Sequence, residues 1–393
     1  MVKRNAIFYN FSNNYLFDEL QKIKENFIKE YPHKQLIDLS IGDTSQPLSK
    51  NIINAIQNSS IKQGKLETYS GYGPVSGQLS LRQKIVKYFY SKTNIHPDDI
   101  FISDGAKPAF DRLHRFFGSN ISVSLPDPAY PAYKDICIAN GVSSITLLPC
   151  SEKYDFFPDI EAIPRTDIIH LCSPNNPTGT VVTRKYLQQL VNTALKNQSI
   201  IIFDAVYSAF ITSSTFPRSI FEIPGAEKCA IEVNSLSKSA GFSGLRLGWI
   251  VISDKLCYDN QETIKSNWKR LNSSIFNGAS SIIQNAAEAA LTNEKYDLNE
   301  TIKVYKNNAL MLKKTLLEQG ITTYGGEQSP YLWIKLKGLT SKEAFNYFLN
   351  EFNILTSPGS GFGPSGEGYL RLSGLASQAS ILSSIERINR PTA

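Results

Sequence analysis

The strongest constraint on the fold is an alternation of short apolar segments with amphipathic ones between about residues 80 and 280. The apolar segments are bounded by turn residues and resemble strands buried on both faces of a parallel sheet. They cover residues 121–125, 168–172, 200–204 and 230–234. Between two of them, residues 184–196 follow the helical period, and Thr183 is suited to be the N-cap. This βαβ order predicts an α/β fold with a mostly parallel central sheet.

The C-terminal part of the sequence has a different pattern, which indicates a second domain. A helical tract over about 281–318 is followed by a strand at 331–335, a further helix and a glycine-rich segment. We therefore expect a large α/β domain at 48–285. A smaller α+β domain would combine residues 286–393 with the N-terminal segment 1–47.

Composition excludes several classes of function. The formal net charge is only +6, and no Lys/Arg-rich run of five or more occurs, so we expect no nucleic-acid partner. No segment approaches the ~18 apolar residues of a membrane span, and the first residues lack the apolar core of a secretory signal. Charged residues make up only 19% of the chain, which indicates surface buried between subunits.

The cysteines and histidines lack the spacing of metal or disulfide motifs. Five scattered cysteines form no C-x-x-C pair, and the four histidines show no ligand spacing. We therefore expect no disulfide framework and no metal site, and a reducing, cytoplasmic location.

A loop of small residues after the 230–234 segment carries Lys238 and Arg246. A lysine amine can form a Schiff base with an aldehyde cofactor, and such a site needs small residues around it. Ser235, Ser237 and Arg246 would donate hydrogen bonds to a phosphate. The alternative for this segment alone is a solvated lysine beside a surface arginine.

Two other predicted strands end in groups that suit a pyridine cofactor. Asp204 ends the 200–204 strand, where α/β sheets build their sites, and would pair with a protonated pyridine nitrogen. Tyr207 and Asn176 would hydrogen-bond a phenolic oxygen on the same ring. Seen alone, Asp204 could merely cap the next turn, and turn chemistry explains the proline and glycine near Asn176.

A predicted helix start offers a seat for the phosphate. Pro108 suits the first helical position, so the free backbone N–H groups of Ala106 and Lys107 would face an anion. Every helix has such a start, so this signal is weak alone. Tyr130, after the next strand, would stack on a planar ring, although a packed loop tyrosine is the alternative.

Two further residues suit a substrate. Arg371 alternates with apolar neighbours in the segment Tyr369–Ser373, and a strand arginine near a site commonly grips a carboxylate. Its alternative is a surface ion pair. Gly42 precedes a turn and lets the backbone approach a ligand closely.

Taken together and in this order, these segments resemble the fold-type I pyridoxal 5′-phosphate (PLP)-dependent aminotransferases. The resemblance rests on the joint pattern Asn175-Asn-Pro-Thr-Gly, Asp204-x-x-Tyr, Ser235-x-Ser-Lys and the trailing Arg246. Over nearly its whole length the chain is similar to the LL-diaminopimelate aminotransferase family. Segments supporting this include Asn14-Tyr-Leu-Phe, Ile41-Gly-Asp-Thr, Tyr69-Ser-Gly-Tyr-Gly, Ser103-Asp-Gly-Ala-Lys, Asp127-Pro-Ala-Tyr-Pro-Ala-Tyr, Phe276-Asn-Gly-Ala-Ser and Pro358-Gly-Ser-Gly-Phe-Gly.

The resemblance implies a role for each matching residue. Lys238 would be the Schiff-base lysine and proton shuttle, with Asp204 on the pyridine nitrogen and Asn176 and Tyr207 on the phenolic oxygen. The phosphate would be held by Ala106, Lys107, Ser235, Ser237 and Arg246, with Tyr72 from the partner subunit of a homodimer. Tyr130 would stack on the ring and also lie near the substrate. The substrate would meet Arg371 at its α-carboxylate, with Tyr15, Gly42, Lys107, Asn176 and Asn277 nearby and Glu67 reaching across the dimer.

The implied reaction is amino transfer between LL-2,6-diaminopimelate and 2-oxoglutarate, which gives tetrahydrodipicolinate and glutamate. The sequence departs from the family at Ala109, where an aspartate is usual, and in a shorter stretch at 148–156, so fine selectivity stays open. The nearest alternative is an aminotransferase of broader specificity, towards lysine or aromatic amino acids. A lyase or decarboxylase, the PLP-binding half of a transcription regulator and an inactive homologue are further alternatives.

Overall fold

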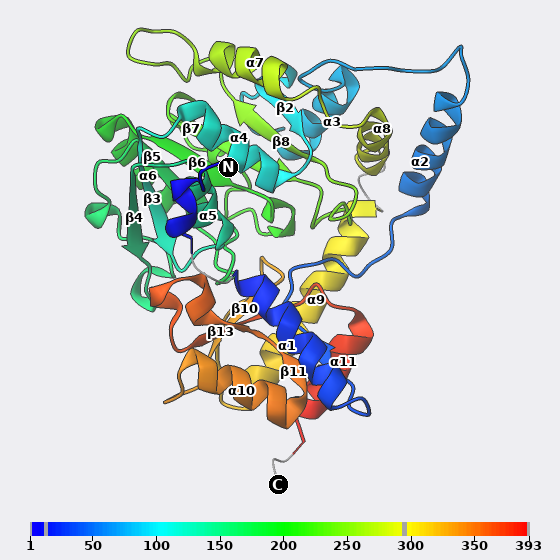
Figure 1. The fold of residues 1–393 in the computed structure, drawn as a ribbon, viewed down its shortest axis with the longest axis vertical. Coiled ribbons are helices and arrows are strands. Elements are labelled where there is room, and N and C mark those ends of the chain that lie inside the picture. The colour runs from blue at the N-terminus through cyan, green and yellow to red at the C-terminus, as the bar shows by residue number, and fades with distance from the viewer. Residues whose placement is uncertain (1, 12–14, 293–296, 391–393) are drawn as a thin grey trace.

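The computed structural model describes residues 2–11, 15–292 and 297–390, which form two lobes (Figure 1). The large lobe is built on a seven-stranded sheet and the small lobe on a four-stranded one. We propose that these lobes are the two domains expected from the sequence, 48–285 and the combined 1–47 and 286–393. Helix α9 (Asp297–Glu318) descends from the side of the large lobe into the small lobe.

The sheet of the large lobe is mostly parallel, as the apolar segments predict. Its strand order is β2-β8-β7-β6-β5-β3-β4, and only β8 runs antiparallel to both of its neighbours. The strands are β2 (Ile100–Ser103), β3 (Ser122–Asp127), β4 (Ser144–Pro149), β5 (Ile168–Cys172), β6 (Ile200–Asp204), β7 (Ala230–Ser235) and β8 (Gly248–Ile252). Because β5, β6 and β7 are parallel neighbours, their carboxyl ends lie at one edge of the sheet.

Helices pack around this sheet. Those that lie closest to its strands are α3 (Leu79–Phe89), α4 (Ala106–Phe117), α5 (Ala132–Ala139) and α6 (Arg184–Asn197). Helix α7 (Ile264–Ile275) lies at the top of the lobe in Figure 1, and α2 (Lys50–Gln63) packs against α8 (Ser281–Ala290) at its side. Helix α6 begins as the sequence predicts, because the Thr183 hydroxyl accepts a hydrogen bond from the Tyr186 backbone N–H at 3.1 Å. The single tract expected at 281–318 is wrong, since α8 ends at Ala290 and α9 begins at Asp297.

The small lobe joins the two ends of the chain. Its antiparallel sheet has the order β12-β13-β10-β9, from β9 (Thr322–Gly325), β10 (Tyr331–Lys335), β12 (Ser357–Pro358) and β13 (Tyr369–Ser373). Strand β1 (Ile37–Asp38) pairs in parallel with β11 (Ile354–Leu355). Helices α1 (Leu16–Glu30), α10 (Ser341–Phe352) and α11 (Gln378–Ile388) contribute Leu20, Phe348 and Ile381 to the lobe's apolar core.

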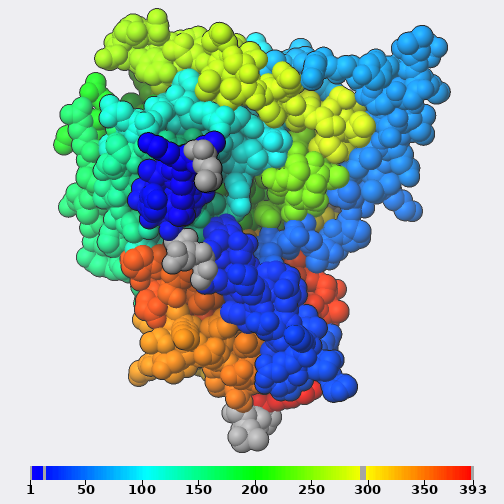
Figure 2. All heavy atoms as spheres, viewed as in Figure 1, coloured from blue at the N-terminus to red at the C-terminus, as the bar shows by residue number. Residues whose placement is uncertain are grey.

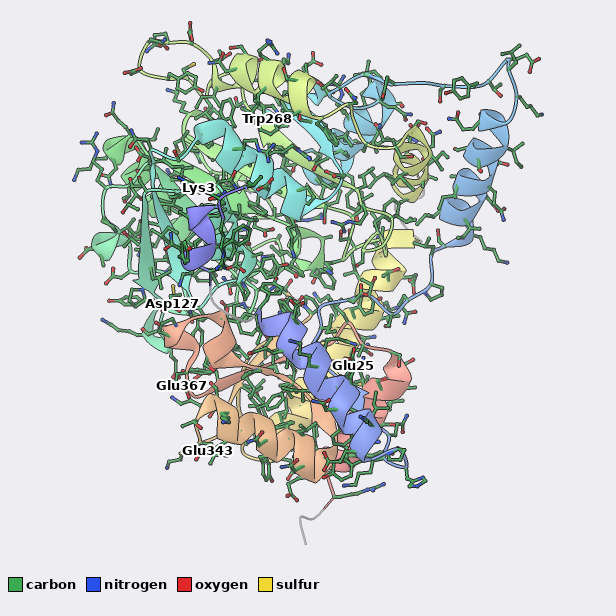
Figure 3. The ribbon with its side chains drawn as sticks, viewed as in Figure 1. Lys3, Glu25, Asp127, Trp268, Glu343 and Glu367 are labelled. Atoms are coloured by element: carbon green, nitrogen blue, oxygen red, sulfur yellow. The ribbon has the colours of Figure 1, made fainter. Side chains whose placement is uncertain are left out.

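Polar contacts join the lobes where the sheet edge meets the small lobe. Asp127, at the end of β3, accepts hydrogen bonds from the Ser365 hydroxyl at 2.8 Å and from the Ser365 backbone N–H. Figure 3 labels Asp127 close to this boundary, with Glu343 and Glu367 below it in the small lobe. The Ser45 and Gln46 N–H groups donate to the Tyr305 hydroxyl on α9, at 2.9 and 2.8 Å. These contacts fix the opening between the lobes.

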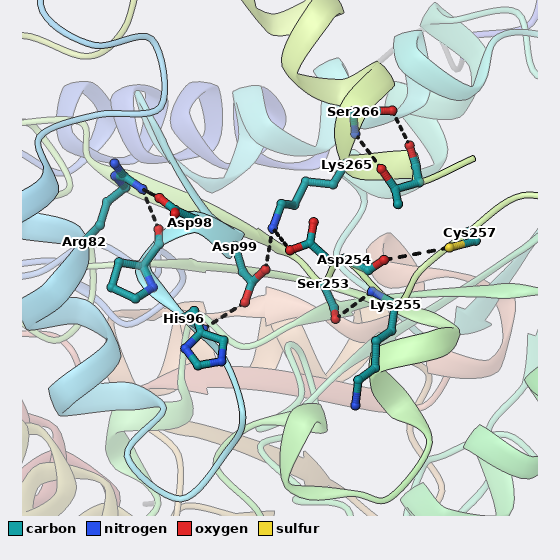
Figure 4. A network of polar contacts seen from close by, with 12 residues as sticks. Arg82, His96, Asp98, Asp99, Ser253, Asp254, Lys255, Cys257, Lys265 and Ser266 are labelled. Atoms are coloured by element: carbon teal, nitrogen blue, oxygen red, sulfur yellow. Dashed lines mark hydrogen bonds and ion pairs between the residues drawn. The ribbon is translucent and has the colours of Figure 1, made fainter. Parts of the chain in front are cut away.

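A partly buried ion cluster ties α7 to the rest of the large lobe. The Lys265 ammonium lies 2.7 Å from a carboxylate oxygen of Asp99 and 2.7 Å from one of Asp254 (Figure 4). Asp99 also accepts from the His96 backbone N–H at 2.8 Å. Removal of Lys265 would leave the buried Asp99 carboxylate without its cation, whereas Asp254 is 72% exposed, so the Lys265–Asp99 pair is the contact that helps to hold α7 in place.

The segment after α2 projects from the large lobe, as Figure 2 shows at the upper right. Leu66 and Tyr72 are 92% and 87% exposed, which is unusual for large apolar and aromatic side chains. Within the described ranges, no helix has both the length and the apolar character needed to cross a membrane.

Candidate functional site

A cavity of about 520 Å³ lies at the carboxyl ends of β5, β6 and β7, between the two lobes. The fold therefore brings together residues as far apart in the sequence as Phe17 and Arg371. Most of the sequence-predicted site residues line this cavity. They are Gly42, Ala106, Lys107, Tyr130, Asn176, Asp204, Tyr207, Ser235, Ser237, Lys238, Arg246 and Arg371.

Lys238 lies in the loop after β7 and extends into the cavity. Its ammonium donates a hydrogen bond to the carbonyl oxygen of Gly42, which belongs to the N-terminal segment. Burial lowers the pKa of Lys238 to about 8, and the positive charges of Arg371, Arg246 and Lys107 act in the same direction against Asp43. A larger share of this amine is therefore neutral near pH 7 than of an ordinary lysine, which makes it a better nucleophile and base.

Asp204 ends β6 in a buried position. Its Oδ2 accepts from the Tyr133 hydroxyl at 2.5 Å, and its Oδ1 accepts from the Val206 backbone N–H at 3.0 Å. Burial raises the pKa of Asp204 to about 6, although both hydrogen bonds oppose this shift. No cation is paired with this carboxylate in the described part of the chain, so a cationic N–H group would complete its environment.

The phosphate seat expected at the start of α4 lies beside the lysine loop. Ser235 and Ser237 are buried, and the Arg246 guanidinium packs against the backbone of Gly105 at the N-cap of α4. A Cβ at Gly105 would collide with that guanidinium, so glycine is required for this close approach. The position predicted for Pro108 is wrong, because α4 begins two residues earlier, at Ala106. The Ala106 N–H, near the helix dipole, still lies at the first turn.

Arg371 lies on β13 and is almost fully buried, being only 1% exposed. It donates to the Asn176 side-chain oxygen at 2.7 Å and to the Ser40 carbonyl oxygen. No carboxylate among the described residues pairs with it, and its Nε has no hydrogen-bond partner. The surface ion pair weighed for this residue is therefore not what the fold builds. An uncompensated buried guanidinium favours an anionic ligand.

Tyr331 was not identified from the sequence, although its strand was. Its hydroxyl lies 2.9 Å from that of Tyr207, and its ring lies 4.6 Å below the Arg371 guanidinium. A Cβ at position 42 would collide with the same hydroxyl, which explains the glycine there. Tyr133, the hydrogen-bond donor to Asp204, was also missed. Its only sequence signal was its place three residues after Tyr130 in the quoted Asp127–Tyr133 motif.

The remaining predicted residues do not line the cavity of this single chain. Tyr15 lines an adjoining pocket of about 310 Å³ on the other side of Tyr130. The Lys107 ammonium lies 5.7 Å from the ring centres of both tyrosines. Glu67, Tyr72 and Asn277 are exposed. Their roles in a shared site remain predictions that need a second subunit.

The residue at the family departure, Ala109, is fully buried in the apolar core beneath α4 and does not line the cavity. The 148–156 stretch forms a short turn at Glu152–Tyr154, outside the cavity walls. Neither departure therefore contacts the space where a substrate would lie in this chain.

The mostly parallel sheet, with a lysine, an aspartate and a buried arginine around one cavity, defines the class of protein. The chain belongs to the class I and II aminotransferase family, whose model matches residues 34–388.

Within that family, the chain is similar to proteins of one activity. It is 46% identical over 388 residues to the LL-diaminopimelate aminotransferase of Chlamydia pneumoniae, covering 98% of this chain and 97% of that one. It is 40% identical to the chloroplastic LL-diaminopimelate aminotransferase of Arabidopsis thaliana, covering 99% and 87%. The structure of the L,L-diaminopimelate aminotransferase from Chlamydomonas reinhardtii matches with a TM-score of 0.94 and 41% identity, covering 98% of both chains.

Proposed function

We propose that this protein is a PLP-dependent aminotransferase that interconverts LL-2,6-diaminopimelate and 2-oxoglutarate with tetrahydrodipicolinate and glutamate. The observation that carries the proposal is that Lys238, Asp204 and Arg371 line one cavity, and that no carboxylate of the described residues pairs with Arg371. The similarity over the whole length to LL-diaminopimelate aminotransferases supports the choice of substrate.

The residues of the cavity fit PLP. Its aldehyde, phosphate and pyridine nitrogen each need a different partner, and the cavity offers Lys238, the Ser235–Arg246 seat and Asp204 respectively. When bound, PLP supplies an aldehyde that condenses with amines and a ring that accepts electrons from the substrate Cα.

The protein's own groups would then orient the substrate and move the proton. Arg371 would hold the α-carboxylate, because its planar fork is already fixed by Asn176 and Ser40. Lys238, with its lowered pKa, would take a proton from the substrate Cα and deliver one to the former aldehyde carbon on the other side of the amino nitrogen, as general base and acid. Asp204, held by Tyr133, would keep a pyridine nitrogen protonated.

We propose further that the working unit is a cytoplasmic homodimer. Leu66, Glu67 and Tyr72 are exposed and do not line the cavity of their own chain. Exposed apolar and aromatic side chains of this kind are typical of a surface that a second subunit covers. Tyr72 would complete the phosphate seat of the partner, and Glu67 would approach the distal amino group of the substrate. The scattered cysteines, none in a disulfide, support a reducing compartment.

The first test is spectroscopic. PLP-loaded protein is mixed with LL-diaminopimelate, and the absorbance of the cofactor is followed as it changes from the aldehyde to the amine form. We expect conversion by the LL isomer and by glutamate, and none by meso-diaminopimelate, lysine or aspartate. Conversion by several of these amines would demote the diaminopimelate assignment to an aminotransferase of broader specificity. A lack of conversion by every amine would contradict amino transfer altogether.

A further inference from the structure

Three soft ligand groups meet in the core beneath the cavity, although their spacing in the sequence shows no metal motif. His114 lies on α4, Cys137 on α5 and His170 on β5. Their ligand atoms all lie within 4.8 Å of one another, and all three residues are buried. The expectation of no metal site considered neighbours along the chain, whereas this cluster is assembled by three separate elements.

The two histidines meet end to end. Their Nε2 atoms are 2.9 Å apart, while the ring centres are 5.1 Å apart and the ring planes differ by 6°. A centre separation so much larger than the nitrogen separation means that the rings lie in line rather than face to face. The two Nε2 atoms therefore face each other across a hydrogen bond, one as donor and the other as acceptor, and the Cys137 Sγ lies 3.7 Å from the Nε2 of His114.

These distances are close to those of a coordination sphere. Bonds of about 2.0–2.1 Å to nitrogen and about 2.3 Å to sulfur place two nitrogen ligands about 3.3–3.6 Å apart and a nitrogen and a sulfur about 3.6–3.8 Å apart. Opening the His114–His170 pair by about half an ångström, and turning each ring by roughly 30° so that its Nε2 faces the sulfur side, would therefore admit an ion between the three atoms.

The chemistry of the surroundings favours one kind of ion. Phe110 and Tyr133 have their rings 5.9 and 5.2 Å from the His170 ring, and no carboxylate belongs to the cluster. The two Nε2 atoms share a hydrogen bond in this structure, and a bound ion would displace the proton of that bond and the proton of the Cys137 thiol. A buried site with one thiolate is electrically neutral with a monovalent ion and retains a positive charge with Zn²⁺. Thiolate and imidazole ligands in a three-coordinate arrangement suit Cu(I).

We propose that His114, Cys137 and His170 form a binding site for Cu(I). The ion would bond α4, α5 and β5 to one another directly beneath the cavity. These elements carry Lys107, Tyr133 and the strand that leads to Asn176, so the ion would brace the scaffold that presents the cofactor-side residues. It would not contact the substrate.

The test measures the transfer of copper to the PLP-loaded protein. Cu(I) is offered under anaerobic, reducing conditions as its coloured bicinchoninate complex, and uptake is read from the loss of colour. We expect the protein to take one Cu(I) per chain and its unfolding temperature to rise. Cys137→Ser should weaken uptake by more than about tenfold, because loss of a ligand exceeds the effect of an outer-shell change.

Cys229→Ser is the matched control. Cys229 is equally buried, but its sulfur faces only the carbonyl oxygens of Val191 and Gly225, so uptake should not change. Equal uptake by Cys137→Ser and wild type, or no uptake by either, would overturn the proposal. Preferential uptake of Zn²⁺ would overturn the choice of ion.

A second measurement does not depend on whether a variant folds. X-ray absorption of copper in the loaded wild-type protein should show one sulfur and two nitrogen neighbours. A shell of oxygen and nitrogen alone would place the copper elsewhere and reject the site.

Discussion

Aromatic side chains are buried and hydrogen-bonded in the cavity, whereas those of the projecting segment at 64–73 are exposed. Tyr207 and Tyr331 are 4% and 1% exposed and hydrogen-bond each other. Tyr69 and Tyr72 are 66% and 87% exposed, with Leu66 beside them. Groups in the cavity are positioned by their own chain, whereas those of the projecting segment have no surface of this chain to cover them. The comparison supports the proposal that one chain positions the groups of the cavity while a second copy would cover the projecting segment.

The largest expected effect tests the cavity side of this comparison. Lys238→Ala should lower turnover by roughly 10³–10⁵-fold, because both the nucleophile and the proton-transfer group are removed. It should also abolish the visible absorbance that reports cofactor attachment. Lys134→Ala, at an exposed lysine on α5, is the control and should leave both unchanged. Full turnover in Lys238→Ala would show that the Lys238 amine is not the reacting group of the cavity.

Asp204→Asn should separate activity from stability. Turnover should fall by roughly 10²–10³-fold, as for loss of one preorganised electrostatic contact, because the pyridine nitrogen would lose its anionic partner. The folded-state pKa of Asp204 is raised to about 6. In the cofactor-free protein, this carboxyl therefore contributes stability that is present below pH 4 and is lost as the pH rises through 6.

The corresponding measurement is chemical unfolding of the cofactor-free protein at pH 4.5 and 7.5. At pH 7.5 the asparagine variant should be more stable than wild type by about 2–3 kcal/mol, and the gain should shrink at pH 4.5. A variant that is less stable at both pH values would show that Asp204 is satisfied without a cationic partner.

Arg371→Ala tests the wall that the small lobe contributes. A charged bidentate contact is worth roughly 1.5–3 kcal/mol, so KM for the amino-acid substrate should rise about ten- to a hundredfold. Steady-state kinetics with LL-diaminopimelate measure it, and Arg371→Lys should recover only part of the loss because a lysine lacks the fork. An unchanged KM would place the carboxylate contact elsewhere.

The smallest effect tests the projecting segment. Tyr72→Phe should weaken PLP binding by up to about tenfold, through loss of one hydrogen bond. At a PLP concentration too low to load Tyr72→Ala homodimers, mixing chains that carry Tyr72→Ala with chains that carry Lys238→Ala should restore about a quarter of wild-type activity, since half of the random dimers hold one intact site. No recovery on mixing would break the comparison, because the outer wall would then belong to the same chain.

Most of the residues that line the cavity could be predicted from the sequence, and for a physical reason. Strands buried on both faces must be apolar throughout, so β5, β6 and β7 could be recognised, and their carboxyl ends fixed where Asp204 and Lys238 would lie. Tyr331 and the His114–Cys137–His170 cluster escaped notice because their partners lie far away in the sequence. The break between α8 and α9 was missed because helical periodicity continues on both sides of it.

The pairing of β1 with β11 has a consequence for how the chain is made. Ile37 and Asp38 can pair only after Ile354 and Leu355 have been synthesised. At about 5–20 residues per second, this happens roughly 15–60 s later. During that interval Leu16, Leu20 and Leu39, all buried in the finished protein, have no core to enter. The large lobe can collapse first, while the apolar side chains of the N-terminal segment stay exposed until synthesis is nearly complete.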